Sequence, residues 1–174
     1  MKRITRVLIA FIGLILIFPS CTYKLSLNGA SIPANMKTIK VDFFENNAAL
    51  VVNNLSTQFT EALKDRIRTT TRLSIVTSEE ADAKMSGTIT DYNIAPVSIN
   101  ATANNVAPIA GASRLTITVN VKYVNNLDKK DNFETSFTKY QDFSGDINAQ
   151  EQTLIAAIDK QLTEDIFNKA FANW

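Results

Sequence analysis

Cys21 is the only cysteine among the 174 residues, and the chain contains no histidine. A lone thiol can act as a nucleophile, or it can be the point at which another group is attached. The lack of histidine excludes a Ser-His-Asp triad, a histidine-liganded zinc and an imidazole base. The five glycines are scattered and form no phosphate-binding loop. The residues therefore predict no catalytic site, no metal and no cofactor. For Cys21 they favour covalent attachment of another group.

The segment before Cys21 is typical of a signal peptide. Three basic residues lie within the first six, and the apolar run VLIAFIGLILIF follows at residues 7–18. This run is shorter than the roughly 20 residues of a membrane-spanning helix. Phe18-Pro19-Ser20-Cys21 resembles a bacterial lipobox, although Phe18 and Pro19 depart from its usual leucine and small residue. An ordinary secretory signal followed by a chance free cysteine is the alternative.

We therefore expect residues 1–20 to be a lipoprotein signal peptide and residues 21–37 a lipidated tether. Fatty acyl chains such as palmitate would anchor Cys21, and two or more chains hold a protein stably on a membrane. Thr22 follows the cysteine. By resemblance to the enteric sorting rule, in which aspartate there retains a lipoprotein at the inner membrane, it favours the outer membrane.

The charge of the remaining chain is balanced. Removing Lys2, Arg3 and Arg6 leaves 15 of the 18 basic residues against 17 acidic ones. Such a balance does not predict nucleic-acid binding.

Apolar periodicity predicts a single α+β domain over residues 38–174. Leu55, Phe59, Leu63 and Ile67 recur every fourth residue and predict a helix over about 50–70. A second helix is predicted from an Asn148–Glu151 capping box to the chain end. Strands are expected at 38–44, 72–77, around 85–94 with a bulge near Asp91, at 114–124 and at 133–143. The order β-α-β-β-β-β-α predicts a mixed sheet of four or five strands with both helices on one face.

Residues 96–113 carry no charge and are rich in small side chains. At this length a segment without secondary structure is commonly functional or disordered. A mobile hairpin tip and a partner-contacting loop both remain open.

Several of these segments resemble the LptE family of lipopolysaccharide-assembly lipoproteins, in a branch distant from the enteric form. They are IKVDFFENNA, LSTQFTEALKDRIRTTTRLSIV, an Ala-Asp-x-x-x-x-Gly strand start in EEADAKMSGTITDYNIAP, RLTITVNVKYVN, and the closing EDIFNKAFANW. The resemblance implies a non-catalytic lipoprotein that plugs and helps assemble the LptD β-barrel. It also implies lipid anchoring at the outer membrane, facing the periplasm or inside the barrel lumen. The polar Thr/Asn face of the predicted sheet suits a polar barrel interior.

If lipopolysaccharide binds directly, cations are needed for its phosphate groups. Candidates on or near the last two strands are Arg114, Lys122, Lys129, Lys130 and Lys139. The alternative for each is a solvated surface charge. Two other functions remain open for the whole chain. It could be another envelope or secretion lipoprotein of the same β-α-β plan, or a periplasmic enzyme or lipid-binding protein whose site lies in 96–113.

Overall fold

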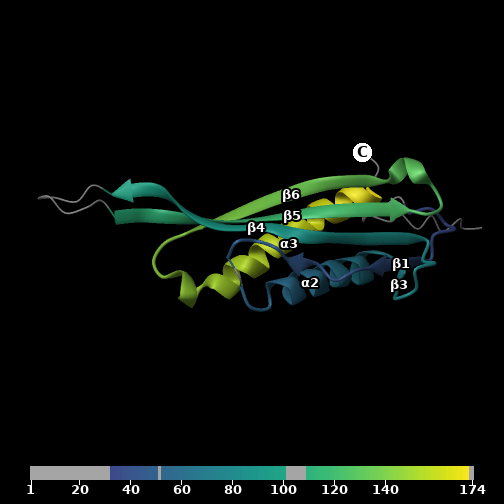
Figure 1. Ribbon diagram of the computed structural model, residues 1–174, viewed down its shortest axis with the longest axis horizontal. Helices are drawn as coiled ribbons and strands as arrows, with labels where there is room; N and C mark the ends of the chain where they lie inside the picture. The colour runs from purple at the N-terminus through teal and green to yellow at the C-terminus, as the bar shows by residue number, and fades with distance from the viewer. Residues whose placement is uncertain (1–31, 51, 101–108, 173–174) are drawn as a thin grey trace, which may run out of the picture.

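The computed structural model describes residues 32–50, 52–100 and 109–172, which form one mixed sheet and two long helices (Figure 1). The elements run β1 (Thr38–Val41), β2 (Glu45–Asn46), α2 (Leu55–Thr70), β3 (Ser74–Val76), β4 (Ala83–Asn100), β5 (Ile109–Asn125), β6 (Phe133–Phe143) and α3 (Glu151–Phe171). Two 3-10 turns flank β6, η1 (Lys129–Asp131) before it and η2 (Ile147–Ala149) after it. The predicted α+β class is confirmed.

The sheet has the order β3-β1-β4-β5-β6, and the short β2 also pairs with β4. β1 is parallel to both β3 and β4, while β4, β5 and β6 form an antiparallel meander. Six strands replace the predicted four or five, because the expected strand 38–44 divides. Phe44 turns into the core and its N–H donates to the buried Thr60 hydroxyl at 3.1 Å, after which β2 resumes pairing with β4.

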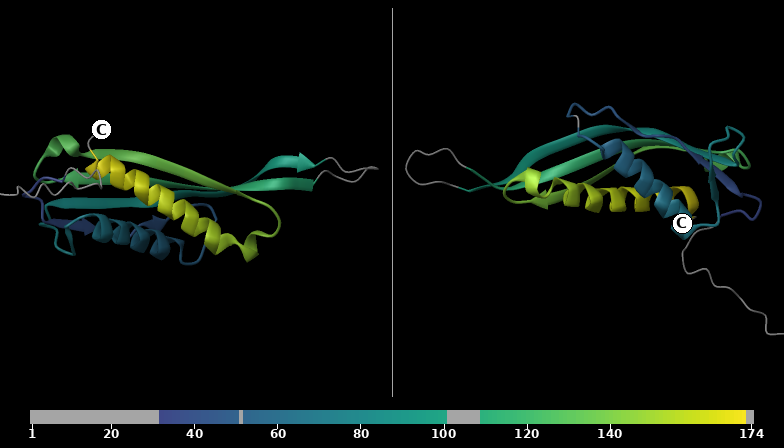
Figure 2. Two further views of the ribbon diagram at one scale, coloured as in Figure 1. Left: turned by 180° about the vertical axis from the view of Figure 1, so that it is seen from behind. Right: turned by 90° about the horizontal axis from the view of Figure 1, so that it is seen from below.

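The core lies between the sheet and the two helices, which cover the same face (Figure 2). The four apolar residues of α2 at fourfold spacing are all buried, as predicted. On β5, alternate residues from Leu115 to Tyr123 are buried beneath the helices. Because successive strand residues point to opposite faces, the residues between them form the other side of the sheet, which we call the outer face. Neither helix in the described part of the chain is both long and apolar enough to cross a membrane.

The strands of the central hairpin are longer than expected. β4 and β5 stay paired as far as Asn100 and Ile109, so most of the predicted loop 96–113 is strand. Three register shifts interrupt the pairing, one of them the expected bulge between Ile89 and Asp91. Each bulge inserts one extra residue, so the side chains beyond it change faces. The alternation of apolar and polar residues that indicates a strand is therefore broken in the sequence. Residues 101–108 lie outside the described part.

This hairpin projects beyond the helices and beyond β6 (Figure 1). Pairing with β6 begins at Ser113, so residues 97–100 and 109–112 pair only with one another. We call these two segments the arm. The arm lies at the end of the long axis opposite the C-terminal end of α3 (Figure 1).

Both helices begin differently from the prediction. α2 starts at Leu55 because Asn54 adopts the left-handed conformation, with φ of 67°, and a helix cannot continue through it. The Asn148–Glu151 capping box is wrong. Asn148 lies in η2, where its N–H donates to Asp146, and α3 begins after Gln150 without a side-chain cap. The closing Trp174 lies outside the described residues.

Candidate binding surfaces

The outer face of β5 and β6 carries a ladder of polar pairs between the strands. The hydroxyls of Thr118 and Thr138 are 2.9 Å apart, and the Asn120 amide donates to the Ser136 hydroxyl at 3.4 Å. Cross-strand pairs of this kind each stabilise a sheet by a few tenths to about 1 kcal/mol. The face is thus polar, yet its groups are hydrogen-bonded to one another.

Arg114 forms one end of this ladder. Its Nε and Nη2 donate to the two carboxylate oxygens of Asp142 at 2.7 and 3.0 Å. Its guanidinium also stacks on Tyr140, with Cζ 3.7 Å from the ring centroid. The hydrogen bond from Arg114 holds the pKa of Asp142 below its usual value. The contacts with Asp142 and Tyr140 therefore fix the position of the Arg114 side chain.

The five candidate cations do not form one site. Lys122 lies on the outer face and approaches Glu134 at 3.8 Å. Lys139 lies opposite Ile117 on the helix side of the sheet, and its Nζ is 2.7 Å from Asp165 of α3. Lys129 and Lys130 lie in η1 at the turn between β5 and β6. A phosphate group would have to compete with a carboxylate at Arg114, Lys122 and Lys139.

The outer face also carries a second charged cluster, which no spacing in the sequence predicts. Lys40 and Lys84 each approach both Asp42 and Glu79, with Lys84 at 3.2 and 3.1 Å from the two acids. The parallel pairing of Lys40 with Lys84 brings these residues together. The four charges cancel, so the cluster extends the neutral polar surface rather than creating a basic patch.

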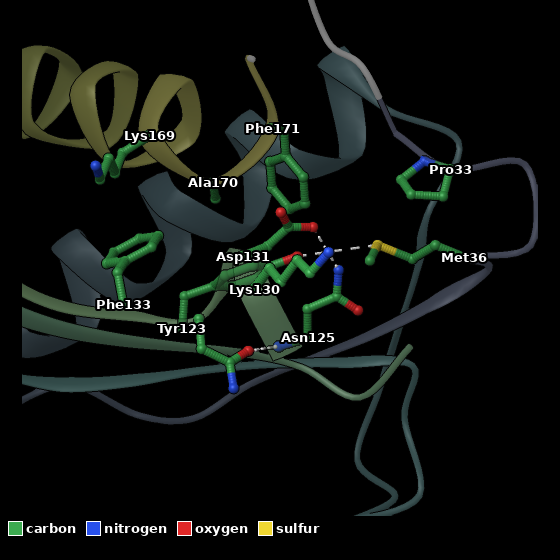
Figure 3. Close-up of a pocket in the computed structure, with 11 residues that line it drawn as sticks. Pro33, Met36, Tyr123, Asn125, Lys130, Asp131, Phe133, Lys169, Ala170 and Phe171 are labelled. Carbon is green, nitrogen blue, oxygen red and sulfur yellow. Dashed lines mark hydrogen bonds between the residues drawn. The ribbon is translucent and has the colours of Figure 1, made fainter. Parts of the chain in front are cut away.

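A cavity of about 210 Å³ opens at the end of the molecule where the chain enters the domain (Figure 3). Residues before β1, the β5–β6 turn and the end of α3 all line it. Lys130 and Lys169 contribute two cations, and Lys169 Nζ lies 5.9 Å from the centre of the Phe133 ring. Lys169 was not among the sequence candidates, because no sequence spacing indicates that the end of α3 meets η1.

The interior of this cavity combines aromatic and polar groups (Figure 3). The Tyr123 ring packs against Phe133 in a tilted arrangement and against Phe171 edge to face, at ring-centroid distances of 5.5 and 5.7 Å. Burial raises the pKa of the Tyr123 hydroxyl, with a smaller contribution from Asp131. The Asn125 amide donates to Asp131 at 3.0 Å. Two ammonium groups beside an aromatic wall suit an anionic group attached to an apolar body.

The arm and the strand ends next to it carry no charge. No Asp, Glu, Lys or Arg occurs between Asp91 and Arg114. Two large apolar side chains, Ile94 and Val97, are exposed there. A neutral hairpin with exposed apolar side chains is a surface that a partner can cover without stripping water from charges.

The model of a protein family described as "LptE: Lipopolysaccharide-assembly" matches residues 36–170. No curated protein matches the chain by sequence. Among solved structures, rare lipoprotein B from Shewanella oneidensis is similar with a TM-score of 0.55 at 11% identity, covering 76% of this chain and 92% of its own.

Two further structures share the fold. Lipoprotein B from Nitrosomonas europaea, described as uncharacterized, has a TM-score of 0.51 at 14% identity and covers 79% of this chain and 82% of its own. A hypothetical protein from Chlamydia trachomatis has a TM-score of 0.51 at 11% identity, covering 79% and 99%. At these identities the likeness shows the fold alone.

Proposed function

This chain belongs to the LptE family of lipopolysaccharide-assembly proteins, and from that membership we propose that it is a non-catalytic, lipid-anchored component of the outer membrane. In this role it plugs an LptD-type β-barrel, helps the barrel to assemble, and thereby supports lipopolysaccharide transport to the cell surface. The two structural neighbours named as lipoproteins support a place in the cell envelope.

The uncharged arm is the observation that carries the proposal. A projecting two-stranded hairpin is marginally stable by itself in water, so an arm of this length benefits from a partner that covers it. The outer face adds to the argument, since its satisfied polar pairs can lie against a polar barrel wall without desolvating unpaired charges. Neither surface requires a reacting group.

Two cavities in the described part of the domain fit a small group better than a whole lipid. Their volumes are about 210 and 280 Å³, whereas small-molecule sites span roughly 300–1,000 Å³. We therefore favour the plug over a lipid carrier. For lipopolysaccharide we propose contact of one phosphate group with Lys130 and Lys169, which line the same cavity, and with Lys129, which precedes Lys130 in η1.

The proposal is tested by co-expressing the tagged chain with the LptD-type barrel of the same cell and purifying it from detergent-solubilised outer membranes. We expect an equimolar complex with the wild-type chain. Val97→Lys should lower recovery of the barrel at least tenfold, because the new charge would be buried without a partner.

Leu127→Lys is the matched control, because Leu127 and Val97 are each 44% exposed but Leu127 lies near η1. It should recover the barrel as well as the wild type does. A wild-type chain that folds and is anchored but purifies without the barrel would contradict the proposed function. Equal losses with both variants would contradict the role of the arm.

A further inference from the structure

α2 and α3 leave a groove of about 280 Å³ between them, and an acidic side chain lies at its base. Asp159 of α3 lines this groove and is only 1% exposed. Both of its carboxylate oxygens are buried, and neither has a hydrogen-bond partner among the described residues. We call this feature the Asp159 groove.

Most of the neighbouring polar groups have other partners, although Arg66 Nε is also buried without a hydrogen-bond partner. The Thr163 hydroxyl donates to the carbonyl oxygen of Lys160 at 3.1 Å. Arg66 of α2 approaches Glu164 at 3.4 Å and lies over the Phe167 ring, with Cζ 5.4 Å from its centroid. Asp65 is paired with Arg68 at 2.8 Å, on the exposed side of α2.

A buried carboxylate without a partner costs the folded state several kcal/mol, and proteins seldom retain one. Here burial raises the pKa of Asp159 to about 7. The charged groups at the groove are Asp65 and Arg66 from α2, with Lys160 and Glu164 from α3. Arg66 is paired with Glu164 and Asp65 with Arg68, and no cation of the described residues, Lys160 included, donates a hydrogen bond to the Asp159 oxygens. Asp159 therefore remains an acceptor in the groove.

We propose that the Asp159 groove receives a lysine or arginine side chain from a partner protein. The small side chains of Ala62 and Ala156 line the groove and leave room for an aliphatic stem. The terminal ammonium or guanidinium would donate to the two free oxygens of Asp159, a charge-assisted pair in a poorly solvated place. That this partner is the barrel rests on the proposed function, since a domain inside the barrel lumen presents its helix side, as well as its outer face, to the inner wall.

The chemistry of the groove is tested first without any partner. The full chain in detergent micelles, labelled with ¹³C at aspartate, is titrated with n-butylammonium chloride while the Asp159 carboxyl resonance is followed by NMR. We expect a saturable shift and a fall of about one unit in the pKa of Asp159, which is a tenfold preference for the ionised form. n-Butanol, which has the same stem without the charge, should give neither.

Three results would overturn the inference: no saturable shift, the same response to n-butanol, or a pKa of Asp159 already below its ordinary value in the free chain. The last would mean that an internal cation, such as Arg66, occupies the site.

The barrel complex supplies the second test. Asp159→Asn should speed dissociation of the barrel at least tenfold, whereas Asp65→Asn at the groove rim should change it less than twofold. The free Asp159→Asn chain should be at least as stable as the wild type, because it loses an unpaired carboxylate. A less stable variant would show that Asp159 supports the fold and would overturn the inference. If the wild type does not bind the barrel, the proposed function is wrong. The amine titration still shows whether the Asp159 groove binds a cation.

Discussion

Asp82 and Gly87 explain the Ala-Asp-x-x-x-x-Gly strand start in terms of the fold. Asp82 Oδ2 accepts the backbone N–H groups of Lys37 and Thr38 at 2.7 and 2.9 Å, and the Thr38 hydroxyl at 3.0 Å. These hydrogen bonds, that of Lys37 first, hold the pKa of Asp82 below its usual value. The ionised carboxylate thus joins the start of β1 to the start of β4. Ala81 beside it is buried.

Gly87 is required because no space exists for a side chain. A Cβ there would lie 2.0 Å from the Asn120 carbonyl oxygen and 2.6 Å from Cε1 of Phe44. We expect Gly87→Ala to lower the free energy of unfolding by about 3 kcal/mol, since the first neighbour is backbone and cannot rotate away. Chemical denaturation checks this, with Ser86→Ala on the outer face as the control. A loss below about 1 kcal/mol would contradict the steric argument.

The carboxylate partners of the candidate cations could not be predicted from the sequence. Arg114, Lys122 and Lys139 are placed on β5 and β6 as expected, but their carboxylate partners come from a neighbouring strand or from α3. Such pairs depend on strand register and on helix placement. Neither can be read from the spacing of one charged residue.

Regular periodicity predicted the elements of the domain wherever it was uninterrupted. β5 and α2 are buried at the predicted positions, and β6 matches its predicted bounds of 133–143. The arm was missed because bulges between Pro96 and Ile99 break the alternation. The start of α3 was missed because a 3-10 turn at residues 147–149 uses the polar residues that resembled a cap. The cavity and the Asp159 groove were not predictable, because each lies where segments distant in the sequence meet.

The meeting of η1 with the end of α3 leads to a prediction about lipopolysaccharide. Lys130→Ala/Lys169→Ala removes both ammonium groups that line the cavity. We expect the affinity for purified lipopolysaccharide to fall about tenfold, since charge-assisted contacts to phosphate are among the strong ones. Binding is measured by surface plasmon resonance at fixed ionic strength. Lys64→Ala/Arg72→Ala removes two cations elsewhere and should leave binding within twofold, whereas equal binding by both double variants would contradict the contact.

The whole molecule is elongated, and its two ends differ (Figure 1). Residues 32–37 enter beside the cavity, near the end of α3, while the arm projects at the opposite end. Ten residues separate Cys21 from Ile32, and a chain of ten spans at most about 35 Å. If Cys21 carries the lipid, the cavity therefore lies within about 35 Å of the membrane surface, and the arm is at the end of the molecule farther from the tether. This polarity agrees with a plug that is held at its base and covered by the barrel at its tip.

The anchor itself is tested by Cys21→Ser. We expect this variant to be released from membranes by a carbonate wash, because without acyl chains the chain has only its protein contacts. Barrel binding could retain it, so the test uses cells that lack the LptD-type barrel. An ordinary cleavable leader replaces residues 1–20 in the Cys21→Ser variant alone, and the control keeps its own residues 1–20. The control is Val97→Lys with Cys21 intact, which should stay in the membrane fraction. Mass spectrometry of that control should show diacylglycerol and a further acyl chain on the N-terminal peptide. A Cys21→Ser chain that remains wholly with the washed membranes would show that something other than the lipid holds the domain there.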